Sequence, residues 1–165
     1  MFSTSSTTKF VGMLALVLLL TPILNTSSAQ DTERGWEPVV SEAQQRSYNG
    51  NQYAPLVRIG DTLIASGVIG LARGQDNSAD AQFRRAFDRI IDILDDHGLD
   101  MGDVAEITTY HVNIGELGRD FMRVKQEYFP EAPFPAWTAI GVDALFLEPA
   151  LIEIRFTAAL RPGSD

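Results

Sequence analysis

Few side chains in this sequence of 165 residues have the type and setting for chemistry, and Glu153 is the most interesting of them. It lies between Ile152 and Ile154 in a largely apolar run. A carboxyl group in such surroundings can have a raised pKa and act as a general acid or base. The alternative is a solvated carboxylate on the open side of a sheet, paired with Arg155 two positions on. The pattern by itself favours that alternative.

Several classes of chemistry have no support in the sequence. There are no cysteines, which excludes disulfides and thiolate chemistry, and His97 and His111 are the only histidines. We interpret them as a helix-end residue and a strand residue rather than as metal ligands. No Gly-x-Ser-x-Gly turn or phosphate-binding loop is present, and Ser66-Gly67 is too short a signal for a nucleophile. We therefore expect neither a metal nor a cofactor.

The N-terminal residues have the pattern of a secretory signal peptide. Lys9 is the only charge before Asp31, the apolar run 10–20 follows it, and Ser27-Ser28-Ala29 offers a small-residue cleavage site. The alternative is an uncleaved anchor, but the run is shorter than the ~20 residues that span a bilayer. We predict a signal peptide over 1–29 and an exported protein, periplasmic or secreted, that has left the membrane after cleavage.

The formal charge of the whole chain is −9, and loss of Lys9 with the leader makes it one unit more negative. Nucleic-acid binding depends on clustered Lys and Arg. Nucleic acid is therefore not expected as a partner.

The first secondary-structure signals after the leader predict a hairpin and a helix. Apolar alternation over 56–59 and 62–68, separated by Gly60-Asp61, is typical of two paired strands. Asn77-Ser78 can cap a helix whose apolar residues recur at helical spacing, and Gly98 is a suitable stop. That apolar face comprises Phe83, Phe87, Ile90 and Leu94.

The second half of the chain predicts three further strands and one helix. A β-prone run covers 104–112, and an amphipathic stripe from Leu117 to Tyr128 ends near Pro130. Strands are expected within 134–142 and 151–160. The order β-β-α-β-α-β-β, with two helices on one face of a mixed sheet, is an α+β sandwich of two layers. Residues 30–52 are expected to be an irregular N-terminal extension, 53–160 the domain, and 161–165 a tail.

The stretch Phe134-Pro135-Ala136-Trp137 opens the fourth of these strands. Its two prolines favour an extended entry. A tryptophan where a loop becomes a strand can cover a core or form the wall of a pocket.

Four short strings, in order and spacing, resemble the RidA/YjgF family of reactive-intermediate imine deaminases, which has a chorismate-mutase-like fold. They are Gln52-Tyr53-Ala54-Pro55, Ser66-Gly67, Phe134-Pro135-Ala136 and Ile152-Glu153-Ile154. The resemblance runs from about Tyr53 to Leu160. It implies a homotrimer whose sheets form an inner barrel, with three clefts between subunits that bind small molecules.

The resemblance also assigns roles to particular positions. Tyr53, Ser66 and Glu153 match site positions of the family, in which the glutamate helps to position water. In the deaminase branch an arginine directly after Pro-Ala grips the substrate carboxylate. Here Trp137 takes that position, and an indole carries no charge. The string 135–142 instead resembles the arginine-lacking, YjgH-like branch. Arg155 could replace the missing cation, although pairing with Glu153 is the simpler interpretation.

Two functions remain open from the sequence. One is an exported hydrolase of an imine-like planar substrate, with Glu153 as the catalytic group and Tyr53 and Ser66 as hydrogen-bonding groups. The other is a non-catalytic trimer that binds a small aromatic or apolar ligand against Trp137. A ribonuclease role is disfavoured by the acidic charge and the missing arginine.

Overall fold

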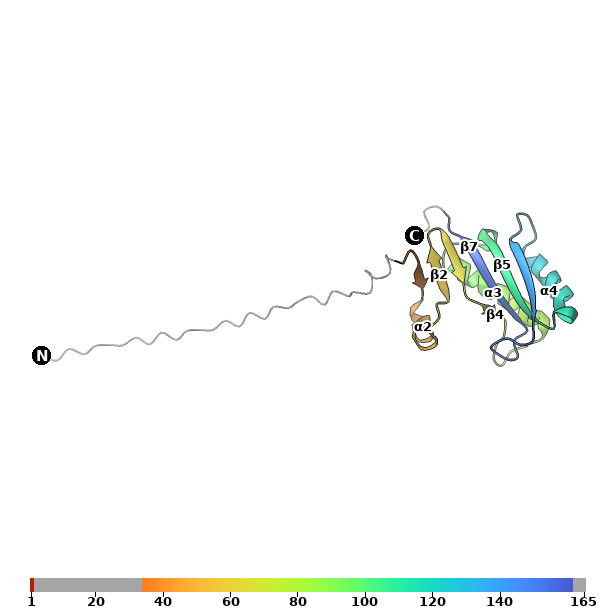
Figure 1. Cartoon of the computed structure of the whole chain (residues 1–165), viewed down its shortest axis with the longest axis horizontal. Helices are drawn as coiled ribbons and strands as arrows, with labels where there is room; N and C mark the ends of the chain where they lie inside the picture. The colour runs from red at the N-terminus through yellow and green to blue at the C-terminus, as the bar shows by residue number, and fades with distance from the viewer. Residues whose placement is uncertain (2–33, 162–165) are drawn as a thin grey trace.

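The computed structural model describes residue 1 and residues 34–161. The predicted signal peptide, apart from Met1, and most of the C-terminal tail lie outside the described residues. Figure 1 shows one layer of strands backed by helices.

The strands form one mixed sheet in the order β1-β2-β3-β7-β5-β6, with β4 pairing to β7. The β5–β6 pair is parallel, and the other described pairs are antiparallel. The sheet is open, and β6 lies at one edge. The strands are β1 (Glu37–Val39), β2 (Leu56–Ile59), β3 (Thr62–Ala65), β4 (Val68–Ile69), β5 (Val104–Val112), β6 (Ala136–Val142) and β7 (Ile152–Ala159).

Two long helices cover one face of this sheet, as Figure 1 shows. They are α3 (Ala79–Asp95) and α4 (Ile114–Tyr128), joined to the strands through loops that include the short 3-10 helix η2 (Met101–Asp103). The apolar stripe of α3 is buried, and Gly98 adopts a φ of +67° just after the helix, where a residue without Cβ is favoured. The predicted α+β sandwich, with its two long helices on one face, is confirmed.

Strand β7 lies near the middle of the sheet and alternates strictly between its two faces. Ile152, Ile154 and Phe156 are buried against the helices, whereas Glu153 and Arg155 lie on the other face. Residues that pair across two strands lie on the same face of the sheet, and Tyr110 of β5 lies opposite Glu153. Tyr110 is therefore on the same face as Glu153. The helix-free face of the sheet therefore carries the polar residues of β7.

The predicted second strand of the hairpin is interrupted. It was expected over 62–68, but β3 ends at Ala65 and the chain re-enters the sheet as β4. The break is a one-residue shift of register along β7, because Ile64 lies opposite Thr157 whereas Val68 lies opposite Ile154. Ser66 itself stays bonded to the segment before β2: its backbone N–H donates to the carbonyl of Pro55 (2.9 Å) and its hydroxyl to that of Ala54 (2.6 Å).

The N-terminal segment differs from the irregular extension that was expected. Strand β1 pairs antiparallel with β2, and Val39 packs against the core. The 3-10 helix η1 (Glu42–Gln44) and the helix α2 (Gln45–Asn51) then return the chain to β2. These elements are too short for periodicity to reveal, since a three-residue strand shows barely one alternation.

None of the helices in the described ranges combines the length and hydropathy needed to cross a bilayer.

Candidate functional site

The centre of the candidate site is the contact between Glu153 and Gly67. A Cβ atom built on Gly67 would lie only 2.6 Å from Cγ of Glu153, and still nearer its carboxyl group. No side chain larger than hydrogen fits beside this carboxylate without displacing it. The break between β3 and β4 therefore lets the backbone approach Glu153, as glycines within strands often do.

Ser66 and Tyr53 precede Gly67 in the sequence and lie in the same cavity wall as that residue. The hydroxyl of Ser66 is fixed by its bond to Ala54, whose neighbour Tyr53 is 46% exposed. Tyr53 directly follows Gln52, which ends α2 in the left-handed conformation with a φ of 56°. The turn at Gln52 thus presents the phenol ring to the surface beside the strand break.

A cavity of about 490 Å³ joins these residues. Tyr53, Ser66 and Gly67 form part of its wall. Glu153 is not a wall residue: it lies on the helix-free face of the sheet, close to Gly67. The structure thus places two of the five site residues predicted from the sequence, Tyr53 and Ser66, in the cavity wall, and a third, Glu153, next to Gly67. The remaining wall residues are Gln44, Pro55, Val68, Ile69, Arg89, Asp92 and Ile93.

Arg89 and Asp92 were missed by the sequence analysis. Both lie on α3 beside its apolar face, where charged residues are ordinarily solvated. The sequence contains no signal that the strand break and the segment around Gln44 and Tyr53 would enclose a cavity against this helix.

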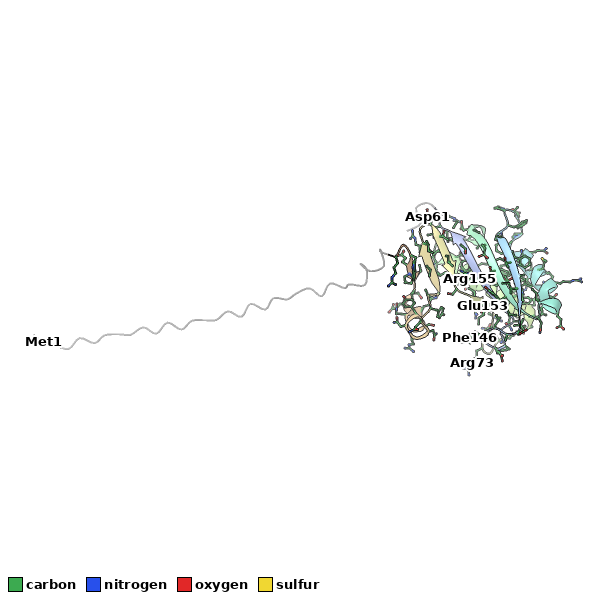
Figure 2. The ribbon with its side chains drawn as sticks, viewed as in Figure 1. Met1, Asp61, Arg73, Phe146, Glu153 and Arg155 are labelled. Carbon is green, nitrogen blue, oxygen red and sulfur yellow. The ribbon has the colours of Figure 1, made fainter. Side chains whose placement is uncertain are left out.

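Arg155 does not pair with Glu153. Figure 2 shows the two along β7, with Glu153 nearer the loop that carries Phe146. Arg155 is exposed, and the ion pairs among the described residues involve other groups. The simpler interpretation, an ion pair between these two residues, is therefore wrong. Arg155 also does not line the cavity.

Trp137 lies on the opposite face of the sheet from Glu153. It is in register with the buried Ile107 of β5, and its ring packs at 6.1 Å from that of Phe121 on α4. The indole N–H donates to the hydroxyl of Thr109 (2.9 Å). Lys125 places its ammonium group 4.5 Å from the ring centre, a favourable cation–π contact. Within one chain, Trp137 and Glu153 do not form one site.

The hydroxyl of Thr109 also contacts the buried His111. Its Oγ1 lies 2.8 Å from Nε2 of the imidazole, whereas Nδ1 is buried without a hydrogen-bond partner. Burial lowers the pKa of His111 to about 4, so the ring is neutral at pH 7. His111 is a core residue, as the sequence indicated, and is remote from the cavity wall.

No group of three or more His, Cys, Asp or Glu side chains in the described part of the chain is arranged to hold a metal ion. The chemistry available at the cavity is that of a carboxylate, a hydroxyl, a phenol and a guanidinium.

Comparison with known proteins places the chain in a family. The family model for endoribonuclease L-PSP matches residues 44–160. The chain belongs to this family. The chain is also similar to the RutC family protein YjgH of Escherichia coli, with 34% identity over 100 residues that cover 59% of this chain and 76% of that protein. The expected RidA/YjgF membership, with its YjgH-like character, is confirmed.

Solved structures of the family share the fold. Protein YjgH matches with a TM-score of 0.65 and 28% identity, over 78% of this chain and 98% of its own. A member of the YjgF/YER057c/UK114 family from Mycobacterium tuberculosis matches with a TM-score of 0.62 and 27% identity, over 76% and 99%. Both matches extend over more of the chain than residues 53–160 alone.

Proposed function

We propose that this protein is an exported RidA-family enzyme that hydrolyses the C=N bond of a small planar substrate. The observation that carries the proposal is the Glu153 carboxylate packed on Gly67, next to Ser66 and the cavity that Tyr53 borders. The backbone of Gly67 lies so close to the Glu153 side chain that a Cβ atom would not fit between them. A fully solvated glutamate would not require so close an approach.

The proposed reaction is the hydrolysis of an imine in two steps. Water adds to the imine carbon while Glu153 accepts its proton, and the imine nitrogen gains a proton to give a carbinolamine. Collapse of the carbinolamine forms the C=O bond and breaks the C–N bond, releasing ammonia. The hydroxyl groups of Ser66 and Tyr53 are suited to orient the substrate by hydrogen bonds.

We further propose that the active assembly is a trimer with its sites between subunits. Strand β6 has an unpaired edge in the described sheet, and Trp137 lies on that strand. Ile140 of β6 is 38% exposed, and Phe146 in the following loop is 98% exposed, which is costly unless another surface covers it. A neighbouring subunit at this edge would bring Trp137 into a cleft that one chain lacks.

Export rests on the sequence of residues 1–29. Expression in a secreting host followed by mass spectrometry should give a mature protein that begins at Gln30. Retention of Met1 in the exported fraction would contradict the assignment.

The central test is Glu153→Gln, which keeps the shape of the side chain but removes its basicity. Turnover of small imines, followed as ammonia release, should fall by at least about 100-fold, the usual range for loss of a general base. Ligand binding should be largely kept. The matched control is Thr157→Val, on the same face of β7, which should leave turnover unchanged. Normal activity of Glu153→Gln would refute the enzymatic proposal.

A non-catalytic binding trimer is the second candidate, and one observation favours it. The position of the family arginine holds Trp137, whose only N–H is already bonded to Thr109. This function predicts that tryptophan fluorescence responds to a ligand that is never consumed. Detection of product would count against it.

A further inference from the structure

The cavity lined by Tyr53 and Ser66 has a positively charged residue in its wall. This residue is not at the position of the family arginine, which Trp137 occupies. Arg89, on α3, lines the cavity and is partly buried. Its guanidinium donates from Nη1 to the carbonyl of Ile69 and from Nη2 to that of Leu71 (3.1 Å). Both partners are neutral, so these bonds orient the positive charge without neutralising it.

Arg89 retains both charge and donors for a ligand. It forms no ion pair among the described residues, although other arginines of α3 and α4 do. A guanidinium has five N–H donors in a rigid fork, and the two backbone carbonyls occupy only part of them. A planar anion is the group that such a fork binds best.

The remaining walls of the cavity restrict the rest of the ligand. Pro55, Val68, Ile69 and Ile93 offer apolar surface, and Tyr53 adds an aromatic ring. The other charged wall residue is Asp92, one turn along α3 from Arg89. Asp92 is exposed, so water and salt screen its charge more than that of the partly buried Arg89.

We propose that Arg89 makes this cavity selective for small apolar or aromatic molecules that carry a carboxylate. The inference rests on the proposed site, and it assigns the anion-binding role to a residue of α3 instead of to Arg155 or to the position of Trp137. The carboxylate would bind to the free edge of the guanidinium, and the apolar part would lie against Val68, Ile69 and Ile93.

Arg85 supplies a matched control, because it lies one turn before Arg89 and stabilises the same loop. Its guanidinium donates to the carbonyl of Gly70, to the carbonyl of Asp76 (2.7 Å) and to Oδ1 of Asn77 (3.3 Å). It does not line the cavity. A loss caused merely by loosening the loop would therefore be shared by variants at both positions.

The experiment measures binding of benzoate and of its neutral isostere benzamide to the mature protein by titration calorimetry. The wild type should bind benzoate at least about tenfold more tightly than benzamide, as expected for a charge-assisted pair of hydrogen bonds. Arg89→Gln should remove this preference while binding of benzamide persists. Arg85→Gln should keep the preference, and Asp92→Asn should increase it by removing the opposing charge.

Three results would overturn the inference. Equal binding of both probes by the wild type would leave the site in place but refute the role of Arg89. An equal loss in Arg85→Gln and Arg89→Gln would show that the loop, not the charge, is responsible. Binding of neither probe would refute both the inference and the proposed site, whereas an inactive but benzoate-selective protein would refute only the enzymatic proposal.

Discussion

The contact between Gly67 and Glu153 gives the short Ser66-Gly67 string a structural role in this chain. Ser66 is bonded to the segment before β2, and the glycine after it lies directly beside the carboxylate. A packed polar group of this kind has fewer accessible rotamers than a solvated one. If Glu153 acts on a ligand as proposed, this restriction would lower the cost of reaching the reactive geometry.

Replacement of Gly67 by alanine should displace the Glu153 carboxylate. We expect turnover to fall towards that of Glu153→Gln, with a loss of only about 0.5–1 kcal/mol in the free energy of unfolding, because the displaced atoms are the flexible end of a side chain. Activity assays and urea denaturation measure the two effects. In a Glu153→Ala background the clash disappears, so the same alanine should then cost less than about 0.5 kcal/mol. Full activity of Gly67→Ala would show that the contact does not position the carboxylate.

His111 gives the protein a stability that depends on pH. Its pKa is about 4 in the folded protein, against an ordinary value of 6.5, because burial disfavours the imidazolium. The unfolded chain therefore binds more protons between these pH values, and acidification favours unfolding. This contribution to stability is present above about pH 6.5 and is lost as the pH falls towards 4.

The expected loss from His111 is about 2 kcal/mol between about pH 7 and about pH 5, from the size of the pKa difference. Urea denaturation at the two pH values measures it. His111→Gln should be less stable at neutral pH but should lack most of this pH dependence. Carboxylates held at low pKa by hydrogen bonds, such as Asp100 beside Arg161, titrate below this window. An unchanged slope in the variant would assign the effect to other groups.

At the scale of elements, α3 and α4 meet through aromatic rings rather than through their surface charges. Phe121 of α4 packs at 5.4 Å from Phe83 and 5.7 Å from Phe87, and its ring also meets His111 and Trp137. The ion pairs that Arg84 and Arg123 form across the two helices are exposed. Exposed pairs contribute little and are weakened by salt.

Truncation of Phe121 to alanine should therefore destabilise the protein severely. Removal of a fully buried phenylalanine typically costs about 3–5 kcal/mol. The adjacent Met122 is 43% exposed, and Met122→Ala on the same helix is the control, with an expected change of less than about 1 kcal/mol. Thermal or urea denaturation measures both. A similar effect of the two variants would mean that the helices are not held by the aromatic cluster.

The elements of the core could be predicted because each has its own pattern. The strand 104–112 was predicted with the bounds that β5 has, and the faces of β7 followed from its alternation. The elements 37–51 and the break at Ser66 could not be predicted in this way. Their geometry depends on pairing with β2 and on bonds to Ala54 and Pro55, which lie elsewhere in the sequence.

At the scale of the whole molecule, the open face of the sheet remains uncovered. Ile59 and Ile140, on two different strands, are exposed at 45% and 38%, and Phe146 projects from the loop beyond β6. Burial of these side chains between copies of the chain would remove apolar surface from water. Such an assembly would also seal the unpaired edge of β6.

Light scattering on the mature protein should thus give three times the mass of one chain. Phe146→Asp should weaken the assembly by placing a charge in the interface. Met122→Asp, a charge on the exposed part of α4, is the control and should leave the mass unchanged. A monomeric wild type would refute both the trimer and the cleft between subunits.

The sequence by itself determined the two-layer α+β fold, through local periodicity, and the family, through short strings at matching spacing; it also proposed Glu153, Tyr53 and Ser66 as site residues. Only the tertiary structure decided what surrounds them. It placed Trp137 against the helices instead of beside Glu153, left Arg155 unpaired with Glu153 and brought Arg89 into the cavity. The physical reason is that periodicity fixes the face on which a residue lies, whereas a site forms where several elements meet.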